Sequence, residues 1–316
     1  MKYFNLNIKI DSDEDSETTP AEIWLDKRKA APIFFGEWTA DDLMSGKAPY
    51  STKALNEARS FIQAVSNGVE INLVTIDSGF VWVYKIVDDL KFGLEYSFIS
   101  KMSGERVVPK YYPIEIIKRE EISAVPYILA AMKSSQAFAR GTFTEINKDG
   151  KKYLGNITAL ECLLGRWTGL PVNPYRCLSS VELETLVAKI FEEHGAHVPA
   201  HRGAVLKDVD IFADLSDADE TIRDEFHGRS KLSIQVKIDI SESTNVEALG
   251  KFLANPDNVL ITGESEPNRR ILQTFGDERY KTCKWISKQV SGVPKVAIWL
   301  EKSLNWLPRE AWRELS

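Results

Sequence analysis

The chain has 316 residues, of which 43% are hydrophobic and 27% charged, a composition typical of a soluble globular protein and unlike that of a disordered one. No apolar run approaches the roughly 18 residues of a membrane span, and the beginning lacks the apolar core of a signal peptide. The three cysteines are widely spaced and match no CxxC metal pattern. They indicate free thiols in a reducing cytosol, so we expect a cytoplasmic protein without a membrane partner.

The charge balance bears on whether DNA is a partner. The formal net charge is −6, whereas phosphate contacts require lysines and arginines gathered on one surface. Much of the acidity is local, because five acidic residues lie between Asp11 and Glu17, and the remainder of the chain is near neutral. The charge therefore argues against DNA binding without excluding it.

The first half of the chain predicts a β-rich domain with a few helices. Residues 54–65 carry apolar side chains at helical spacing. Two strand-like segments, 71–76 and 80–86, flank Asp77-Ser78-Gly79, a sequence typical of a hairpin turn. The other predicted elements are strands within 2–10, 96–99, 114–118 and 142–146 and short helices at 125–132 and 158–164.

A domain boundary is predicted where glycine and proline gather. Residues 165–174 contain two glycines and two prolines, which interrupt regular structure. We therefore expect a β-rich α+β domain over residues 1–165, a linker over 166–178 and a second domain over 179–316.

The second half predicts an α/β domain in which helices flank a mixed sheet. It opens with a helix that Ser179 or Ser180 can cap, with Glu182 in its first turn and Gly195 just past its end. The polar stretch 214–230 interrupts the pattern, and we interpret it as an exposed loop. The later predicted strands are 209–213, 232–238, 259–261 and 295–300, and the later helices are 245–253 and 279–290.

Polar side chains on two of these strands form a candidate catalytic set. Successive side chains of a strand alternate between faces, so Gln235 and Lys237 share one face, and Asp208 and Asp210 likewise share one. Magnesium prefers carboxylate and other oxygen ligands, and a neighbouring lysine can stabilise negative charge that develops on a phosphate. An acid, an amide oxygen and a lysine on adjacent strands therefore suit metal-dependent phosphodiester hydrolysis.

The second domain resembles the Mrr-type restriction endonuclease domain of the PD-(D/E)xK superfamily. The resemblance lies in ELETLVAKIFEEHGAHV, DVDIFA, SIQVK, NVEALGKFLA and NVLITG, in that order. It implies a restriction-endonuclease-like fold, DNA as substrate and Mg²⁺ or Mn²⁺ as cofactor. It also implies that Asp210 and Gln235 lie beside the metal, that Lys237 is the catalytic lysine, and that Glu184, from the opening helix, completes the site.

Two features depart from the family's pattern. The glycine-rich Gly-Asp-x-Gly run that precedes the essential Asp is replaced by GAVLKD at 203–208. The stretch between Asp210 and Gln235 also exceeds the usual tight hairpin, because 214–230 is inserted. The loop that approaches the site is therefore expected to differ from that of the family.

These features favour a metal-dependent DNA endonuclease of prokaryotic restriction or anti-phage defence, acting as a homo-oligomer. The alternative is a non-catalytic DNA-binding or assembly subunit that keeps the nuclease fold. An Asp followed by Gln-x-Lys also arises by chance, so the two hypotheses differ in whether Asp210, Gln235 and Lys237 converge.

A zinc site is a weaker hypothesis for the second domain. Its candidate ligands would be Cys177, His194, His197 and His201, but their spacing matches no standard zinc site. A solvated turn, or a basic rim near DNA, is the favoured interpretation.

The first domain resembles the EVE/PUA-like domains that read modified or flipped bases in an aromatic cage. The resemblance lies in FFGEW at 34–38, GFVWVY at 79–84 and SQAFARGTFTEI at 135–146. It implies a modified base or a nucleotide as partner, with Trp38 and Trp82 as stacking residues. The alternative is that these rings form the core of a small β-barrel, which leaves recognition and assembly both open for this domain.

Overall fold

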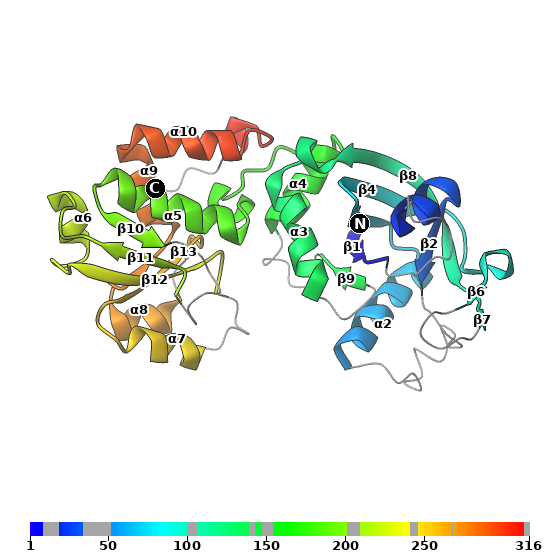
Figure 1. Ribbon diagram of the computed structural model, residues 1–316, viewed down its shortest axis with the longest axis horizontal. Helices are drawn as coiled ribbons and strands as arrows, with labels where there is room; N and C mark the ends of the chain where they lie inside the picture. The colour runs from blue at the N-terminus through cyan, green and yellow to red at the C-terminus, as the bar shows by residue number, and fades with distance from the viewer. Residues whose placement is uncertain are drawn as a thin grey trace. The chain divides into compact units, whose positions relative to one another are not determined.

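The structure is a computed structural model that describes residues 1–8, 19–33, 52–99, 106–138, 143–146, 154–200, 209–240, 246–266 and 268–312. The chain divides into two compact units, Met1–Gly165 and Arg166–Ser316. Both units combine helices with a mixed sheet (Figure 1). None of the described helices has both the length and the apolar character that crossing a membrane requires.

A seven-stranded sheet organises the first unit, in the order β2-β8-β4-β3-β1-β9 with β5 paired to β8. Its strands are β1 (Lys2–Leu6), β2 (Ala30–Ile33), β3 (Ile71–Asp77), β4 (Phe80–Ile86), β5 (Lys91–Phe92), β8 (Lys110–Glu121) and β9 (Phe143–Glu145). A separate ribbon joins β6 (Phe98–Ile99) to β7 (Arg106–Val107). The helices are the π-helical turn η1 (Glu22–Lys27), α2 (Thr52–Ser66), α3 (Tyr127–Phe138) and α4 (Leu154–Leu163), with the short turns η2 (Leu94–Tyr96) and η3 (Ile122–Ala124).

The predicted hairpin is confirmed in β3 and β4. The two strands are antiparallel and end on the pair Asp77–Phe80. The two turn residues have positive φ angles, 47° at Ser78 and 82° at Gly79, which is the backbone twist that favours tight hairpins. Glycine adopts this conformation without the steric cost that a Cβ atom brings.

Helix α2 covers one face of this sheet, as its predicted apolar stripe requires. The Phe61 ring packs edge-on against Phe4 of β1 at 5.2 Å and against Tyr112 of β8 at 5.8 Å between ring centroids. Tyr3, the neighbour of Phe4, points to the opposite face, where its hydroxyl donates a hydrogen bond to Glu161 of α4. Helices therefore cover both faces of the sheet at β1.

The prediction that Trp82 stacks on a base is wrong for this structure. The Trp82 side chain is 0% exposed and belongs to the same apolar cluster as Phe4 and Phe61. A ring with no exposed face cannot receive a base, so the core interpretation of this aromatic holds. Trp38, the other predicted stacking residue, lies outside the described residues.

The burial of Trp82 predicts a large loss of stability on truncation. Trp82→Ala should lower the free energy of unfolding of the first unit by about 3–5 kcal/mol, because it leaves a cavity in the core. Phe92→Ala is the matched control, since Phe92 is 58% exposed. Urea unfolding of the full chain measures both variants, and a Trp82→Ala protein as stable as Phe92→Ala would contradict the core assignment.

The second unit contains a five-stranded mixed sheet in the order β10-β11-β12-β13-β14. Its strands are β10 (His197–Ala200), β11 (Ile211–Asp214), β12 (Lys231–Lys237), β13 (Asn258–Thr262) and β14 (Tyr280–Lys281). β11 is antiparallel to both of its neighbours, β10 and β12, whereas β12, β13 and β14 are parallel. The helices are α5 (Ser180–Glu193), α6 (Glu220–Glu225), α7 (Val246–Leu253), α8 (Arg269–Phe275), α9 (Cys283–Gly292) and α10 (Pro294–Ser303), with the short turns η4 (Pro174–Cys177) and η5 (Arg309–Ala311).

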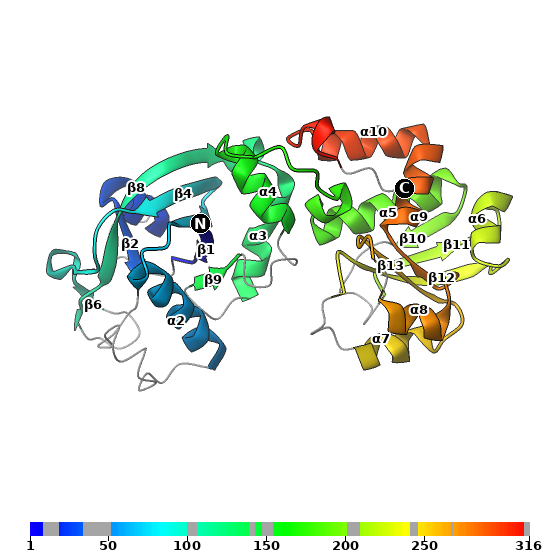
Figure 2. The same ribbon diagram turned by 180° about the vertical axis from the view of Figure 1, so that it is seen from behind.

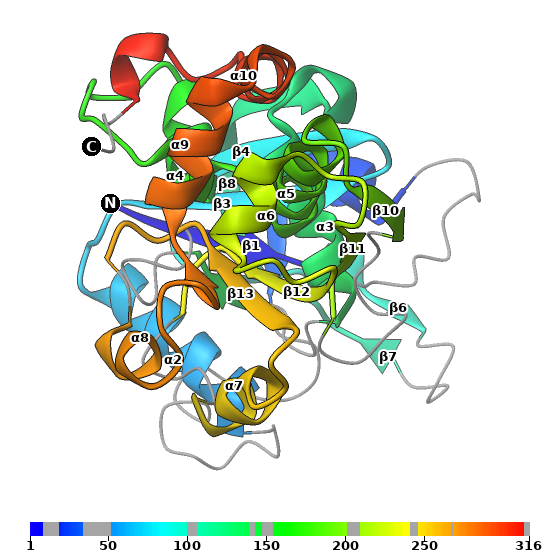
Figure 3. The same cartoon turned by 90° about the vertical axis from the view of Figure 1, so that its left-hand side faces the viewer.

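Helices cover both faces of this sheet, as predicted. Helices α5, α9 and α10 lie on one side and α7 and α8 on the other (Figures 1 and 2), and the end-on view shows α7 and α8 together below β12 and β13 (Figure 3). Helix α5 begins with the predicted cap: the Ser179 side chain accepts the Glu182 amide, and the Glu182 carboxylate accepts the Ser179 amide.

Two predicted elements of the second unit are wrong. Residues 295–300 were expected to form a strand but belong to α10, which starts at Pro294, a favoured first helical residue. Val296 and Leu300 are buried four residues apart, while Ile298 between them is 52% exposed, which is the spacing of a helix. The expected exposed loop 214–230 contains α6 and buries apolar side chains, namely Ala218, Ile222 and Phe226.

Candidate functional site

Asp210 lies immediately before β11 and is fixed against β12 by two hydrogen bonds. Its backbone amide donates to the carbonyl of Ile234 over 2.9 Å. Its carboxylate oxygen Oδ2 accepts the backbone amide of Val236 over 2.8 Å. A carboxylate held by a backbone donor has one preferred orientation, so the position of Asp210 follows from the pairing of the two strands.

The strand register brings Gln235 and Lys237 to Asp210. Ile211 pairs with Ile234, and Asp210 bonds to the backbone of Ile234 and Val236, so Asp210 lies beside the part of β12 that carries Gln235. Lys237 lies two residues further along and faces the same way. Its Nζ atom is 3.8 Å from Asp210 Oδ2, and the two side chains are 39% and 13% exposed. Lys237 therefore contacts a largely buried acid and remains accessible to a ligand.

Glu184, on α5, is the fourth member of the set. The pKa of its carboxyl group is raised to about 7, first by burial and then by the negative charge of Asp210, while the positive charge of Lys237 lowers it. Glu184 is therefore electrostatically coupled to both strand residues. The structure therefore brings Glu184, Asp210 and Lys237 together, and strand alternation puts Gln235 on the face of β12 that carries Lys237.

These residues fit a divalent cation such as Mg²⁺ or Mn²⁺. Gln235 is only 6% exposed, and its side-chain oxygen Oε1 has no hydrogen-bond partner among the described residues. A buried amide oxygen without a donor is costly unless a cation or water satisfies it. Two carboxylates and an amide oxygen are ligands that hard cations accept. The described residues contain no group of three His, Cys, Asp or Glu suited to a metal, and this set has two carboxylates and one amide oxygen.

Other predicted residues do not join the site. His194 places Nδ1 2.8 Å from the Asp219 carboxylate and Nε2 2.9 Å from Gln289 Oε1, so both ring nitrogens have protein partners instead of zinc. Asp208 and His201 lie outside the described residues.

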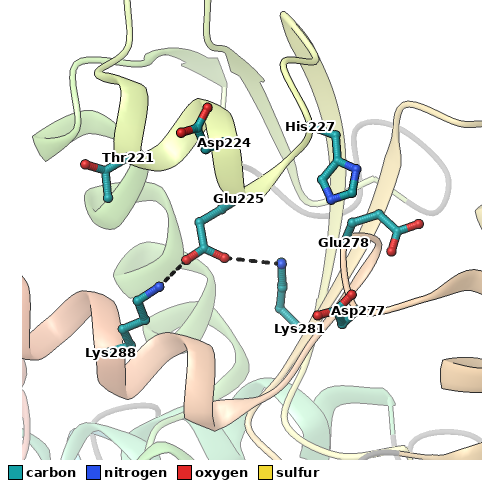
Figure 4. Close-up of a pocket in the computed structure, with 8 residues that line it drawn as sticks. All are labelled: Thr221, Asp224, Glu225, His227, Asp277, Glu278, Lys281 and Lys288. Atoms are coloured by element: carbon teal, nitrogen blue, oxygen red, sulfur yellow. Dashed lines mark hydrogen bonds and ion pairs between the residues drawn. The ribbon is translucent and has the colours of Figure 1, made fainter.

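A hollow of about 390 Å³ lies elsewhere in the second unit (Figure 4). Glu225 of α6, which lines it, pairs with the buried Lys281 at 3.5 Å and also with Lys288. None of the four predicted site residues lines it. The hollow is therefore separate from the candidate site.

The sequence reasoning missed a second group of polar residues near Lys237. Asp239 follows Lys237 by two residues and pairs with Arg176 at 2.8 Å. Glu264 accepts the backbone amide of Ile240 over 2.7 Å. The alternation of strand faces could have indicated Asp239, but no local pattern pointed to Arg176 or Glu264.

Comparisons of the chain with protein-family models, with curated proteins and with solved structures give no match. The chemistry of the site therefore has to be inferred from its own residues.

The raised pKa of Glu184 predicts that this residue destabilises the metal-free protein at alkaline pH. Below its ordinary pKa of 4.5 the carboxyl group is protonated in both the folded and the unfolded chain, so it does not destabilise the fold. Above that pH the unfolded chain loses the proton more readily, and the unfolding free energy falls until the pH has passed the folded pKa of about 7. Glu184→Gln should therefore raise the unfolding free energy at pH 8 by on the order of 1–2 kcal/mol, with little change at pH 5. Thermal unfolding in chelator at both pH values measures the difference.

Two comparisons make this prediction specific. Glu247→Gln, which alters the exposed pair with Lys251, should show no such pH dependence. Mn²⁺ should raise the melting temperature of the parent protein at pH 8 and that of Glu184→Gln much less, because a ligand that binds the folded state stabilises it. Equal Mn²⁺ shifts in both proteins would remove Glu184 from the ligand set.

Proposed function

We propose that the second unit is a metal-dependent DNA endonuclease of the PD-(D/E)xK superfamily, Mrr-like in its Gln-x-Lys motif. The observation that carries the proposal is the meeting of Asp210 and Lys237, 3.8 Å apart, at the end of a strand that also holds Gln235, whose buried oxygen has no hydrogen-bond partner among the described residues. An assembly subunit has no need of a buried amide oxygen and a destabilising carboxylate at one place.

Each residue has a distinct part in the proposed reaction. Asp210, Gln235 and Glu184 would hold the divalent cation. When bound there, the cation would lower the pKa of a water molecule and neutralise charge on the phosphate. Lys237, as the partly exposed cation of the set, would orient the attacking water or stabilise the negative charge that develops on the phosphate.

The Val236 amide supports this chemistry by holding the Asp210 carboxylate in one orientation. The same bond also fixes the direction of the other carboxylate oxygen. Asp210 therefore does not have to reorient during the reaction. Preorganisation of charged groups is a large part of the catalytic effect in such sites.

The biological setting belongs to the same proposal. An endonuclease of this kind would act on DNA in prokaryotic restriction or anti-phage defence, as a homo-oligomer, with the first unit as its recognition or regulatory domain. We assign no base-stacking residue to the first unit, because Trp82 is part of its core.

Removal of Lys237 should abolish cleavage. Lys237→Ala should lower the rate of plasmid cleavage with Mg²⁺ or Mn²⁺ by at least about 100-fold, because the charge that stabilises the transition state is lost. Lys231→Ala is the matched control, since Lys231 is an exposed lysine at the other end of β12 and should retain full activity. Chelator should stop cleavage by the parent protein.

The test also separates the alternative function. A parent protein that binds DNA but leaves plasmid intact with both metals would be a non-catalytic subunit. A Lys237→Ala protein that cuts as fast as Lys231→Ala would show that cleavage uses a different site.

A further inference from the structure

Within the second unit, the segment before α5 crosses the carboxyl ends of β12 and β13. The Asn173 side-chain amide donates to the carbonyl of Gly263 over 2.8 Å, and the Gly263 amide donates to the carbonyl of Lys237 over 3.0 Å. A Cβ atom on Gly263 would stand 3.0 Å from the carbonyl oxygen of Ile238 and 3.4 Å from that of Tyr175. The backbones meet so closely here that only glycine fits without a shift.

An ion pair fastens the same segment to the residues that follow Lys237. The Arg176 guanidinium lies 2.8 Å from Asp239 Oδ2, and the two side chains are only 15% and 13% exposed. Breaking a buried pair by removing one partner is strongly destabilising, because the other charge stays buried. Arg176 therefore constrains the chain two residues beyond the catalytic lysine.

Glu264 extends this constraint across the sheet. Its Oε1 atom accepts the Ile240 amide over 2.7 Å, and its Oε2 atom accepts the Tyr280 hydroxyl over 3.3 Å. The Tyr280 hydroxyl in turn accepts the backbone amide of Asn268, at the start of α8, over 3.0 Å. A chain of polar contacts thus ties the ends of β12, β13 and β14 to one another and to the segment before α5.

The electrostatics of this network agree with its geometry. Burial raises the pKa of the Glu264 carboxyl group, and the nearby charge of Asp239 raises it further, while the positive charge of Arg176 lowers it. Arg176 therefore faces two carboxylates that repel each other. Its removal would leave both acids unneutralised at the strand end that follows Lys237.

We infer that Arg176 and Glu264 are positioning residues that fix the carboxyl end of β12, and with it Gln235 and Lys237. The inference rests on the proposed nuclease function. It adds two residues that would contact neither the metal nor the DNA. Residues that orient a metal site from behind are typically worth about 10–100-fold in metal affinity or activity. Such residues matter because a displacement of the ligands by a fraction of an ångström removes the productive geometry of the site.

The test compares Arg176→Ala with a control of similar burial in the same unit. The control is Glu225→Ala, which removes a partly buried acid from its pairs with Lys281 and Lys288 (Figure 4), away from the site. Both variants should lower the melting temperature. We expect only Arg176→Ala to speed amide hydrogen exchange at residues 237–240 and 263, a measurement that needs no catalysis.

Activity gives the second readout. Arg176→Ala and Glu264→Ala should lower kcat by about 10–100-fold with little change in KM for DNA, and Arg176→Lys and Glu264→Gln should restore most of the rate. Glu225→Ala should keep the parent kcat below its melting temperature. The Mn²⁺ concentration that gives half of the melting-temperature shift should rise in the alanine variants, since Gln235 lies on the loosened strand.

The outcomes separate the two proposals. If exchange at residues 237–240 is unchanged in Arg176→Ala, or if its kcat falls no more than that of Glu225→Ala, the positioning role is refuted. If the parent protein neither binds Mn²⁺ nor cuts DNA, the nuclease proposal fails, while the exchange measurement still decides whether Arg176 holds the strand end.

Discussion

The second unit depends on the hydrogen bond from the Val236 amide to the Asp210 carboxylate. Asp210 is the residue immediately before β11, and this bond fixes the start of that strand against β12. A slip of one residue in the pairing of β11 with β12 would send every side chain of the strand to the opposite face. The same bond therefore specifies the register that makes the core and the direction in which Gln235 and Lys237 point.

Much of this arrangement could be predicted from the sequence, because the signals are local. Strand alternation placed Gln235 and Lys237 on one face, and the Ser179–Glu182 pair marked the start of α5. The short apolar run at 295–300 fits a buried strand as well as a helix, and only packing decides between them. Arg176 and Asp239 are 63 residues apart, and no periodicity connects residues at that separation. Long-range polar contacts of this kind form only when the fold is complete.

Stability and chemistry oppose each other at the candidate site. Glu184 and the Gln235 amide are both held in surroundings that disfavour them in the absence of a ligand. Natural proteins tolerate such local conflicts mainly at functional positions, where the rest of the fold compensates. Here the compensation comes from the apolar stripe of α5 and the buried faces of β12 and β13, whose core residues are almost fully enclosed.

The contacts of Asn173 and Arg176 limit where a fragment of the second unit can begin. A fragment beginning at Ser179, where the first helix of the second unit is capped, would contain every residue proposed to act in catalysis. It would nevertheless leave Asp239 as an uncompensated buried charge and remove the donor on the Gly263 carbonyl. The smallest piece expected to retain the native strand ends therefore begins before Asn173, within the stretch that its glycines and prolines mark as a connection.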